Sequence, residues 1–245
     1  MTTQILGNVF ENYEEIDSTQ TEIHRRIEKC KIQNGTIIMA NRQTNGKGTH
    51  GRVWHTGNEN NIAFSFYIET ECKPQKIEGI TIEIAQILIQ IFEEKYGINL
   101  QIKAPNDIYY NGKKVGGILT ESKIVGQKTK YIVVGIGINC SCEDFPDEIQ
   151  GIAGGIPGSY SKNALAAEVV NQLLDIASNI EARDFIDEYR QSSMVIGKNI
   201  NVIKTGREPV AAFAEDIDSN GALIVRYPDG TREALTTGEV SIRLR

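Results

Sequence analysis

The sequence predicts an α+β fold, in which a mixed β-sheet with flanking helices is followed by a small, barrel-like β domain. Up to residue 192, short runs of alternating apolar residues are interleaved with longer segments of helical period, as in helices packed on a sheet. From Gly197 onward, turn residues separate short strand-like runs and no helical period occurs. We place the boundary near residues 193–197, which gives domains of residues 1–194 and 195–245.

Composition limits the class of protein. With 245 residues, 40% of them hydrophobic and 24% charged, the chain resembles a soluble globular protein with a sizeable core. Its net charge of -6 argues against a nucleic-acid or anionic-membrane binder. The first residues lack a signal-peptide pattern and no apolar run is long enough to span a membrane, so we expect a cytoplasmic protein. The four cysteines, Cys140 and Cys142 included, form no CxxC pair and are interpreted as free thiols.

The first polar segment of interest follows a short strand. Tyr13–Ile16 is predicted as that strand, Asp17–Gln20 as a turn and Thr21–Cys30 as a helix. The carboxylate and hydroxyl side chains of the turn are of the kind that cap helix N-termini. They could instead face a polar ligand at the helix N-terminus, and the residues leave both interpretations open.

A glycine-rich stretch from Gln43 to Trp54 follows the apolar run Thr36–Ala40. Its glycines permit backbone conformations that let several N–H groups converge on an anion, and Lys47 and Arg52 add positive charge. We therefore expect a strand followed by a phosphate-cradling loop. The stretch matches neither the Walker A nor the dinucleotide-binding pattern, so a flexible surface loop is the alternative.

The next two segments are expected to be scaffold. Ile62–Ile68 alternates bulky apolar residues with smaller ones and is predicted as a half-buried strand. Ile77–Tyr96 switches to helical period, with an apolar stripe along one side and Glu83 and Gln86 on the other. Gly97 stands where a helix commonly ends.

The remaining elements are short. Asn111-Gly112 is a strong two-residue hairpin turn, followed by Lys113, Lys114 and the adjacent glycines Gly116-Gly117. Adjacent glycines in a strand often mark the close approach of a ligand. Helices are predicted after Ser161 and at Asp184–Ser192. The predicted strands are Asn99–Lys103, Ile108–Tyr110, Val115–Ser122, Tyr131–Asn139, Asn199–Lys204, Val210–Ile217, Ala222–Tyr227 and Thr231–Leu235.

Six segments occur in an order that resembles one known family. They are Ser18-Thr19-Gln20, Gln43 to Trp54, Lys103 to Asp107, Lys114 to Glu121, Gly135 to Asn139, and Gly238 to Arg243. As an ordered set, covering almost the whole chain, they resemble the biotin protein ligases, which activate biotin with ATP and attach it to carrier proteins. The resemblance implies a class II synthetase-like catalytic domain of the biotin/lipoate ligase type and a C-terminal SH3-like β-barrel.

The resemblance also implies a reaction. Biotin is converted to biotinyl-5'-AMP and then transferred to a lysine of a biotin carboxyl carrier protein. Two anions, the biotin carboxylate and the α-phosphate, have to meet, and a cation fixed between them removes the main electrostatic obstacle. Lys114 matches the family's lysine at this position and is the expected catalytic residue.

Other family positions are matched residue by residue. The implied biotin-binding set is Ser18, Thr19, Gln20, Gln43, Gly46, Lys47, Gly48, Thr49, Lys114, Gly116 and Gly117. The implied ATP- or adenylate-binding set is Lys47, Arg52, Trp54, Asn106, Asp107 and Asn139, with Gly238 to Arg243 near the adenine. Asp107 is also the expected ligand of Mg²⁺. Trp54, the chain's one tryptophan, either stacks near the nucleotide or anchors the loop in the core.

Two departures from the family pattern concern this site. Arginines are common in the family where this chain has Lys47, Thr49 and His50, so the loop has fewer charged and bidentate groups with which to retain the intermediate. A tryptophan commonly precedes Pro-Asn-Asp, where Ala104 stands here. Part of one apolar wall is then supplied by another side chain.

The expected partner is the biotin carboxyl carrier domain of a biotin-dependent carboxylase, with no nucleic acid and no membrane. Few residues precede the first strand, so we expect a ligase without an N-terminal DNA-binding domain, either a monomer or a homodimer. The alternatives are a lipoate or octanoate ligase or transferase of the same fold, and a non-catalytic biotin-binding protein. The glycine loop with Gln43 and the Gly238 to Arg243 segment favour biotin.

Overall fold

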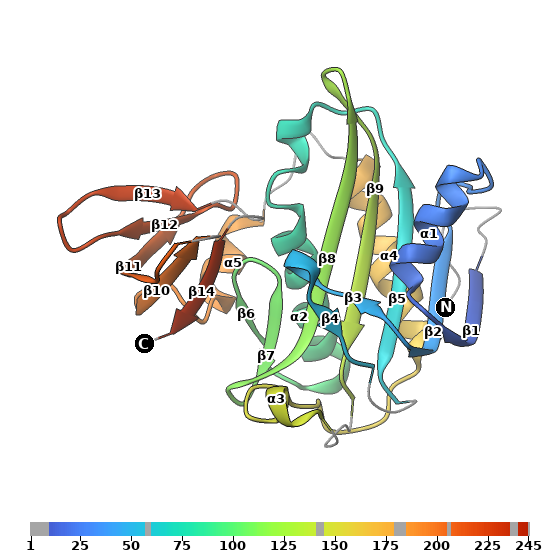
Figure 1. Ribbon diagram of the computed structural model, residues 1–245, viewed down its shortest axis with the longest axis horizontal. Coiled ribbons are helices and arrows are strands. Elements are labelled where there is room, and N and C mark those ends of the chain that lie inside the picture. Colours follow the sequence, from blue (N-terminus) through green and yellow to red (C-terminus); the bar gives the residue numbers. More distant parts are fainter. Residues whose placement is uncertain are drawn as a thin grey trace. The chain divides into compact units, whose positions relative to one another are not determined.

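The computed structural model describes residues 10–56, 60–140, 145–178, 185–204, 207–235 and 240–244. The chain forms two compact units (Figure 1). The first comprises Met1–Ile77 and Ile108–Arg183, and the second comprises Glu78–Asp107 and Asp184–Arg245. The boundary that we placed near residues 193–197 stays a prediction.

The first unit is built on a mixed sheet in which the strands β1-β2-β5-β9-β8-β7 are neighbours in that order. β1 pairs with β2 in parallel, and the pairs β2–β5, β5–β9 and β8–β9 are antiparallel. The strands are β1 (Phe10–Ile16), β2 (Ile37–Gln43), β5 (Ile62–Glu69), β7 (Asp107–Tyr110, in this unit from Ile108), β8 (Lys113–Val125) and β9 (Lys128–Ile138).

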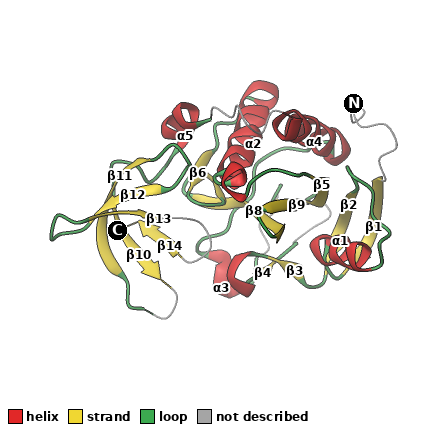
Figure 2. Ribbon diagram, turned by 90° about the horizontal axis from the view of Figure 1, so that it is seen from above, coloured by secondary structure: helices red, strands yellow, loops and turns green. Residues whose placement is uncertain are grey.

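Helices and a small hairpin complete this unit. The helical elements are α1 (Thr19–Glu28), α3 (Asp147–Gln150), α4 (Lys162–Ser178) and the 3₁₀ turns η1 (Thr49–Gly51) and η2 (Pro74–Ile77). The hairpin pairs β3 (Gly46–Lys47) with β4 (Val53–Trp54). Helices α1 and α4 both pack against β5 and lie on opposite faces of the sheet (Figure 2).

The two faces of the sheet differ in side-chain size. Because side chains alternate along a strand, Phe64 and Phe66 of β5 point to one face, while Ala63, Ser65 and Tyr67 point to the other. Helix α1 covers this second face, where Ile23 packs with Ile38, Tyr67 and Val133. The prediction of a half-buried strand is therefore wrong: residues 62–68 are buried on both faces, because α1 covers the smaller side chains.

The second unit contains α2 (Ile80–Tyr96), β6 (Gln101–Lys103), α5 (Ile186–Ser192) and an antiparallel sheet. The sheet has the strand order β13-β12-β11-β10-β14. Its strands are β10 (Asn199–Lys204), β11 (Val210–Ile217), β12 (Leu223–Arg226), β13 (Arg232–Leu235) and β14 (Val240–Leu244). The predicted small β domain is confirmed as this sheet, and its closure into an SH3-like barrel stays a prediction. The last strand, β14, was not predicted.

Local turn and cap chemistry agrees with the sequence at several positions. Asn111 and Gly112 have φ values of 48° and 75°, as a two-residue hairpin turn of this kind requires. Gly97 ends α2 with a φ of 65°. Ser161 Oγ accepts the Ala164 N–H at the start of α4.

Helix α2 departs from its prediction in two respects. It begins at Ile80, since Pro74–Ile77 form a separate 3₁₀ turn. Glu83 and Gln86, expected on the solvent side, are 8% and 6% exposed. The N-terminal half of α2 is buried on almost all sides, which is why a single apolar stripe describes it poorly.

The structure also bears on the cysteines and on membranes. Within the described ranges, no helix is long and apolar enough to cross a membrane. Cys30, Cys72 and Cys140 are free thiols, whereas Cys142 lies outside the described residues. No group of three or more His, Cys, Asp and Glu side chains in the described part of the chain could hold a metal ion.

We expect the contact between α1 and the sheet to dominate the stability of the first unit. Ile38 is 0% exposed and packs with Ile23, whereas Ile124 of β8 is 48% exposed. Ile38→Ala should lower the free energy of unfolding by about 2–5 kcal/mol, because it leaves a cavity. Ile124→Ala loses the same β-branched side chain and should cost about 1 kcal/mol or less. Urea denaturation measures both, and equal losses would contradict this account of the core.

Candidate functional site

The turn between β1 and α1 is held by ionic contacts. Ser18 Oγ accepts the Thr21 N–H at 3.4 Å and so caps α1, as its sequence position indicates. Asp17 Oδ1 accepts the Ser18 N–H at 2.8 Å, and the Asp17 carboxylate pairs with Arg25 in the second turn of the helix. The Arg25 guanidinium holds the pKa of Asp17 below its usual value. Asp17 therefore positions the start of α1.

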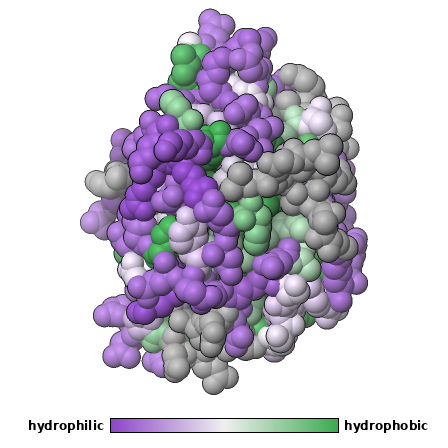
Figure 3. Space-filling model, turned by 90° about the vertical axis from the view of Figure 1, so that its right-hand side faces the viewer, coloured by the Kyte–Doolittle hydropathy of each residue, from purple (hydrophilic) through white to green (hydrophobic). Residues whose placement is uncertain are grey.

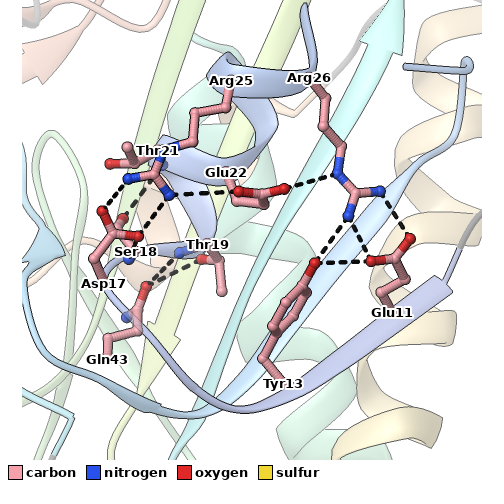
Figure 4. A network of polar contacts seen from close by, with 10 residues as sticks. All are labelled: Glu11, Tyr13, Asp17, Ser18, Thr19, Thr21, Glu22, Arg25, Arg26 and Gln43. Carbon is pink, nitrogen blue, oxygen red and sulfur yellow. Dashed lines mark hydrogen bonds and ion pairs between the residues drawn. The ribbon is translucent and has the colours of Figure 1, made fainter. Parts of the chain in front are cut away.

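A second ionic group fastens the same helix to β1 (Figure 4). Arg26 pairs with Glu11 of β1 and with Glu22, and donates to the Tyr13 hydroxyl at 3.0 Å. Hydrogen bonding to Arg26 lowers the pKa of Glu11. The side of the molecule that carries β1 and α1 is predominantly hydrophilic (Figure 3). These contacts fix α1 from its outer side.

On the side of α1 that faces the sheet, two of its side chains belong to a series of hydrogen-bonded polar groups, which we call the polar chain. Gln43 Oε1 accepts the Thr19 N–H at 2.9 Å and lies 3.1 Å from Thr19 Oγ1. Thr19 Oγ1 lies 2.9 Å from Ser65 Oγ, which donates to Gln20 Oε1 at 2.9 Å. Gln20 Nε2 donates to Glu121 Oε2 at 2.7 Å. Thr19, Gln20 and Ser65 are 3%, 4% and 0% exposed, so this polar chain is shielded from solvent.

The polar chain ends in an ion pair. His24 Nε2 lies 2.8 Å from Glu121 Oε2, the oxygen that also accepts from Gln20. The hydrogen bond to Glu121 raises the pKa of His24, and the one from His24 lowers the pKa of Glu121. Both side chains are more than a third exposed, at 36% and 46%. The pair lies at the solvent end of the buried chain.

Strand glycines form the neighbouring part of this face. Gly137 pairs with Gly117 across β9 and β8, and Gly135 lies two residues before Gly137. A Cβ atom at Gly137 would lie 2.4 Å from Cε2 of Trp54, and one at Gly135 would lie 2.7 Å from Oε1 of Gln20. Only glycine allows these two side chains to lie so close to the strand. Trp54 thus anchors the glycine-rich stretch against the sheet.

The glycine-rich stretch forms a hairpin, and its role as a phosphate cradle stays a prediction. Gly46 pairs with Trp54, and the Gly48 N–H donates to the Arg52 carbonyl at 2.8 Å. The side chains of Lys47 and Arg52 are exposed, and Thr49 is half-buried. The hairpin therefore carries its cations on the solvent side and its tryptophan toward the strand glycines.

Lys114 lies beside the same glycines. Its Nζ is 5.8 Å from the centroid of the Trp54 ring, a cation–π distance, and 3.7 Å from the position of a Cβ at Gly117. Its backbone is fixed, since its N–H donates to the Ile152 carbonyl at 2.8 Å and its carbonyl accepts the Gly154 N–H at 2.9 Å. Lys114 is therefore an ammonium group on a rigid strand.

Asn139 lies at the end of β9 and is tied to the same backbone. Its N–H donates to the Val115 carbonyl at 2.7 Å, and its Nδ2 donates to the Gly154 carbonyl at 3.3 Å. Asn139 is 4% exposed, and its Oδ1 has no hydrogen-bond partner among the described residues. A buried acceptor of this kind is available to a ligand that donates a hydrogen bond.

Gly116 lies on the other face of the sheet, and the remaining expected site residues belong to the second unit. Gly116 points to the opposite face from Gly117, where an added Cβ would lie 3.2 Å from Cβ of Ile108. Asn106 and Asp107 are half-buried and belong to the second unit. Ala104, at the departure noted above, is buried there. Of the Gly238 to Arg243 segment, residues 238 and 239 lie outside the described residues and the rest belongs to β14.

Sequence reasoning gave no role to four residues that the structure brings to this face. These are His24, Ser65, Gly135 and Glu121. Ala63 and Ser65, like Gly135 and Gly137, are small residues at alternate positions of their strands, which is the signal that could have revealed a small-residue face. His24 and Glu121 are 97 residues apart, and no local pattern joins them.

Comparison with known proteins identifies the family. The model of the Biotin/lipoate A/B protein ligase family matches residues 13–139, and that of the Biotin protein ligase C terminal domain matches residues 195–243. The chain belongs to the biotin protein ligase family. The predicted family and fold class are thereby confirmed.

Two curated relatives and one solved structure illustrate the relationship. The "Bifunctional ligase/repressor BirA" of Bacillus spizizenii is 30% identical over 241 residues, covering 94% of this chain and 73% of that protein. The "Biotin--[acetyl-CoA-carboxylase] ligase" of Mycobacterium tuberculosis is 27% identical over 239 residues, covering 91% and 85%. The biotin protein ligase of Aquifex aeolicus in complex with biotin and ATP superposes with a TM-score of 0.77 at 23% identity, covering 97% and 99%, and so shares the fold.

The contact between Trp54 and Gly137 is testable by fluorescence, because Trp54 is the chain's one tryptophan. In Gly137→Ala the new Cβ would overlap the indole ring, so the ring has to move off the strand. We expect Trp54 emission to shift toward that of a solvent-exposed tryptophan, with a loss of about 1–3 kcal/mol in stability. Gly151→Ala is the control, since nothing lies within 4 Å of its added Cβ. Unchanged emission in Gly137→Ala would refute the anchoring role.

The His24–Glu121 pair predicts a pH dependence of stability. The raised pKa of His24 contributes stability that is complete below the usual 6.5 and is lost as pH rises through the raised value. The lowered pKa of Glu121 contributes stability that is complete above the usual 4.5 and is lost as pH falls through the lowered value. The pair therefore stabilises the fold most between pH 4.5 and 6.5.

Urea denaturation of the wild type and of Glu121→Gln measures this effect. The difference in free energy of unfolding should be larger at about pH 5.5 than at about pH 8.5. NMR titration should place the His24 pKa above 6.5 in the wild type and return it toward that value in Glu121→Gln. A difference that grows with pH would contradict the assignment.

Proposed function

We propose that this chain activates biotin with ATP to biotinyl-5'-AMP and transfers the biotinyl group to a lysine of a biotin carboxyl carrier protein. One observation carries the proposal: polar hydrogen-bonding groups and a fixed ammonium lie along one glycine-bearing face. Gln20 lies at Gly135, and Lys114 lies at the Gly137–Gly117 pair. Gly135 and Gly137 are about 7 Å apart along the strand. A ligand with a ureido group at one end and a carboxylate at the other fits this arrangement.

The chemistry follows from the charge of Lys114. An oxygen of the biotin carboxylate attacks the α-phosphorus of ATP, the bond to the β-phosphate oxygen breaks, and pyrophosphate leaves. The ammonium group lowers the repulsion between the two anions and stabilises the charge that develops on the α-phosphate. The carrier's lysine amine then attacks the acyl carbon of the anhydride, AMP leaves, and an amide is formed.

The hairpin that ends at Trp54 supports both steps. An acyl-adenylate hydrolyses when water reaches it, so a lid over the site protects the intermediate. The Trp54 ring covers Gly137 and Gly117, and Lys114 Nζ lies beside both the ring and Gly117. In this proposal the ring moves aside to admit biotin and then packs against it.

The nucleotide is assigned to polar and cationic groups outside the polar chain. Asn139 Oδ1, a buried acceptor, suits the exocyclic amine of adenine. Lys47 and Arg52 are exposed cations suited to the phosphates. Asn106 is assigned to the same ligand from the resemblance alone.

Magnesium is proposed to arrive with ATP. The described residues form no group of three metal ligands, so a Mg²⁺ ion would depend on phosphate oxygens and water for most of its coordination. A single carboxylate, that of Asp107, fits this mode of binding. When bound, the ion would neutralise phosphate charge and help pyrophosphate to leave.

The alternatives account for less of the site. A lipoate or octanoate enzyme handles an acyl chain without N–H donors, which leaves the buried chain of Thr19, Ser65 and Gln20 without a purpose. A binding protein without catalysis has no need for Lys114. The biotin carboxyl carrier domain of a biotin-dependent carboxylase is the proposed partner, and the cytoplasm is the proposed location.

Pyrophosphate exchange tests the function. Purified protein with Mg²⁺ should exchange labelled pyrophosphate into ATP when biotin is added, and not when lipoate or octanoate is added. Lys114→Ala should lower the rate about 10²–10³-fold, because it removes the cation at the reacting groups. Lys113→Ala, at an exposed residue whose Nζ donates to the Gly151 carbonyl, is the matched control. Exchange driven by lipoate alone, or near-normal exchange by Lys114→Ala, would refute the proposal.

A further inference from the structure

The hydrogen bonds of the buried polar chain run in one donor-to-acceptor direction, and the carboxylate of Glu121 determines that direction. Glu121 is ionised, since His24 lowers its pKa, and an ionised carboxylate can only accept hydrogen bonds. The Gln20 amide, 2.7 Å away, must therefore turn its NH₂ group toward Glu121 and its oxygen toward Ser65. Without the carboxylate, the two orientations of the Gln20 amide would have similar hydrogen-bonding potential.

The orientation of Gln20 fixes the protons of the two hydroxyl groups that follow. The Gln20 oxygen cannot donate, so the single proton of Ser65 Oγ points to it. Ser65 then has no proton left for Thr19, so Thr19 is the one possible donor in the contact at 2.9 Å. The other group within reach of Thr19 Oγ1 is Gln43 Oε1 at 3.1 Å, which is also an acceptor. In either case the Thr19 proton stays inside the chain, and Thr19 offers a ligand only its lone pairs.

Gln43 presents the complementary group. Its Oε1 accepts the Thr19 N–H, so its NH₂ group points away, and one N–H donates to Thr56 Oγ1 at 3.3 Å. Its second N–H has no acceptor among the described residues and is available as a donor. Thr19 as acceptor and Gln43 as donor form a pair that matches the N–H and C=O of a ureido or amide group.

We propose that Glu121, supported by His24, is a positioning residue that sets the proton direction through Gln20, Ser65 and Thr19 and so makes the site selective for ligands with an N–H donor. The inference rests on the proposed function and specifies how biotin is distinguished from an acyl chain. Glu121 does not touch the ligand in this scheme. Its effect should therefore depend on which ligand is bound, unlike a general loss of structure.

Calorimetric binding of matched ligands tests the proposal. The probes are biotin and its two carbamate analogues, in which one or the other ureido N–H is replaced by oxygen. The wild type should bind at least one analogue about tenfold more weakly than biotin, since an acceptor would face an acceptor. In Glu121→Gln the Gln20 amide can turn and Ser65 can donate to Thr19. The Thr19 proton is then held by Gln43 Oε1 alone and can turn outward to a ligand. The ratio of the affinity for biotin to the affinity for the weaker analogue should then fall by about tenfold.

Two further variants give the test its controls. Glu15→Gln removes a carboxylate from an exposed ion pair with Arg42 and should leave the ratio unchanged. The double variant Gln20→Glu/Glu121→Gln exchanges the carboxylate and the amide, so that the carboxylate stands at residue 20, next to Ser65. Ser65 must still donate to it, so the ratio should return toward the wild-type value. Thermal unfolding checks that each variant is folded.

The outcomes separate the two proposals. If the wild type binds no biotin, the proposed function fails. If the wild type binds biotin but Glu121→Gln keeps the same ratio for both analogues, the function stands and the positioning role is overturned. An unrestored ratio in a folded double variant would overturn the positioning role as well.

Discussion

The absence of side chains at three positions of the central strands is the constraint on which the site depends. Gly117, Gly135 and Gly137 leave the backbone of β8 and β9 uncovered on one face, and larger groups from other elements occupy the space. Trp54 enters over Gly137 and Gln20 enters over Gly135. Any β-carbon there would crowd either Trp54 or the Gln20 amide. The hairpin, helix α1 and Lys114 all take their positions from this one surface.

Helix α1 covers the part of the sheet that carries small residues. Ion pairs of its charged side chains fix its position there. Asp17 and Glu11 anchor the helix through Arg25 and Arg26 on its outer side. Glu121 anchors its inner side through Gln20 and His24. Exposed ion pairs of this kind contribute little stability individually. Their combined effect is to fix the direction of α1, and with it the buried hydroxyl and amide groups.

Sequence patterns predicted those features of the fold that depend on neighbouring residues in the sequence. The Asn111-Gly112 turn, the Gly97 helix end and most strands follow from backbone preferences of a few adjacent residues. Those patterns could not show that β5 is covered on both faces, because α1 is distant in sequence and contributes the second layer. Nor could they pair His24 with Glu121. Lys114 and the polar turn were found through resemblance, whereas their common face appears only when alternate residues of three strands are aligned.

The contact of Trp54 with the strand glycines explains how the glycine-rich stretch is held although it departs from the family's arginine-rich pattern. An arginine-rich loop would hold phosphate by charge, and this chain has Thr49 and His50 where arginines are common. The hairpin is instead held by backbone pairing between Gly46 and Trp54 and by the indole ring on the strand glycines. Apolar contact with glycine does not depend on the presence of phosphate. The hairpin of this protein can therefore keep its place over the strand glycines with fewer charges than an arginine-rich loop carries.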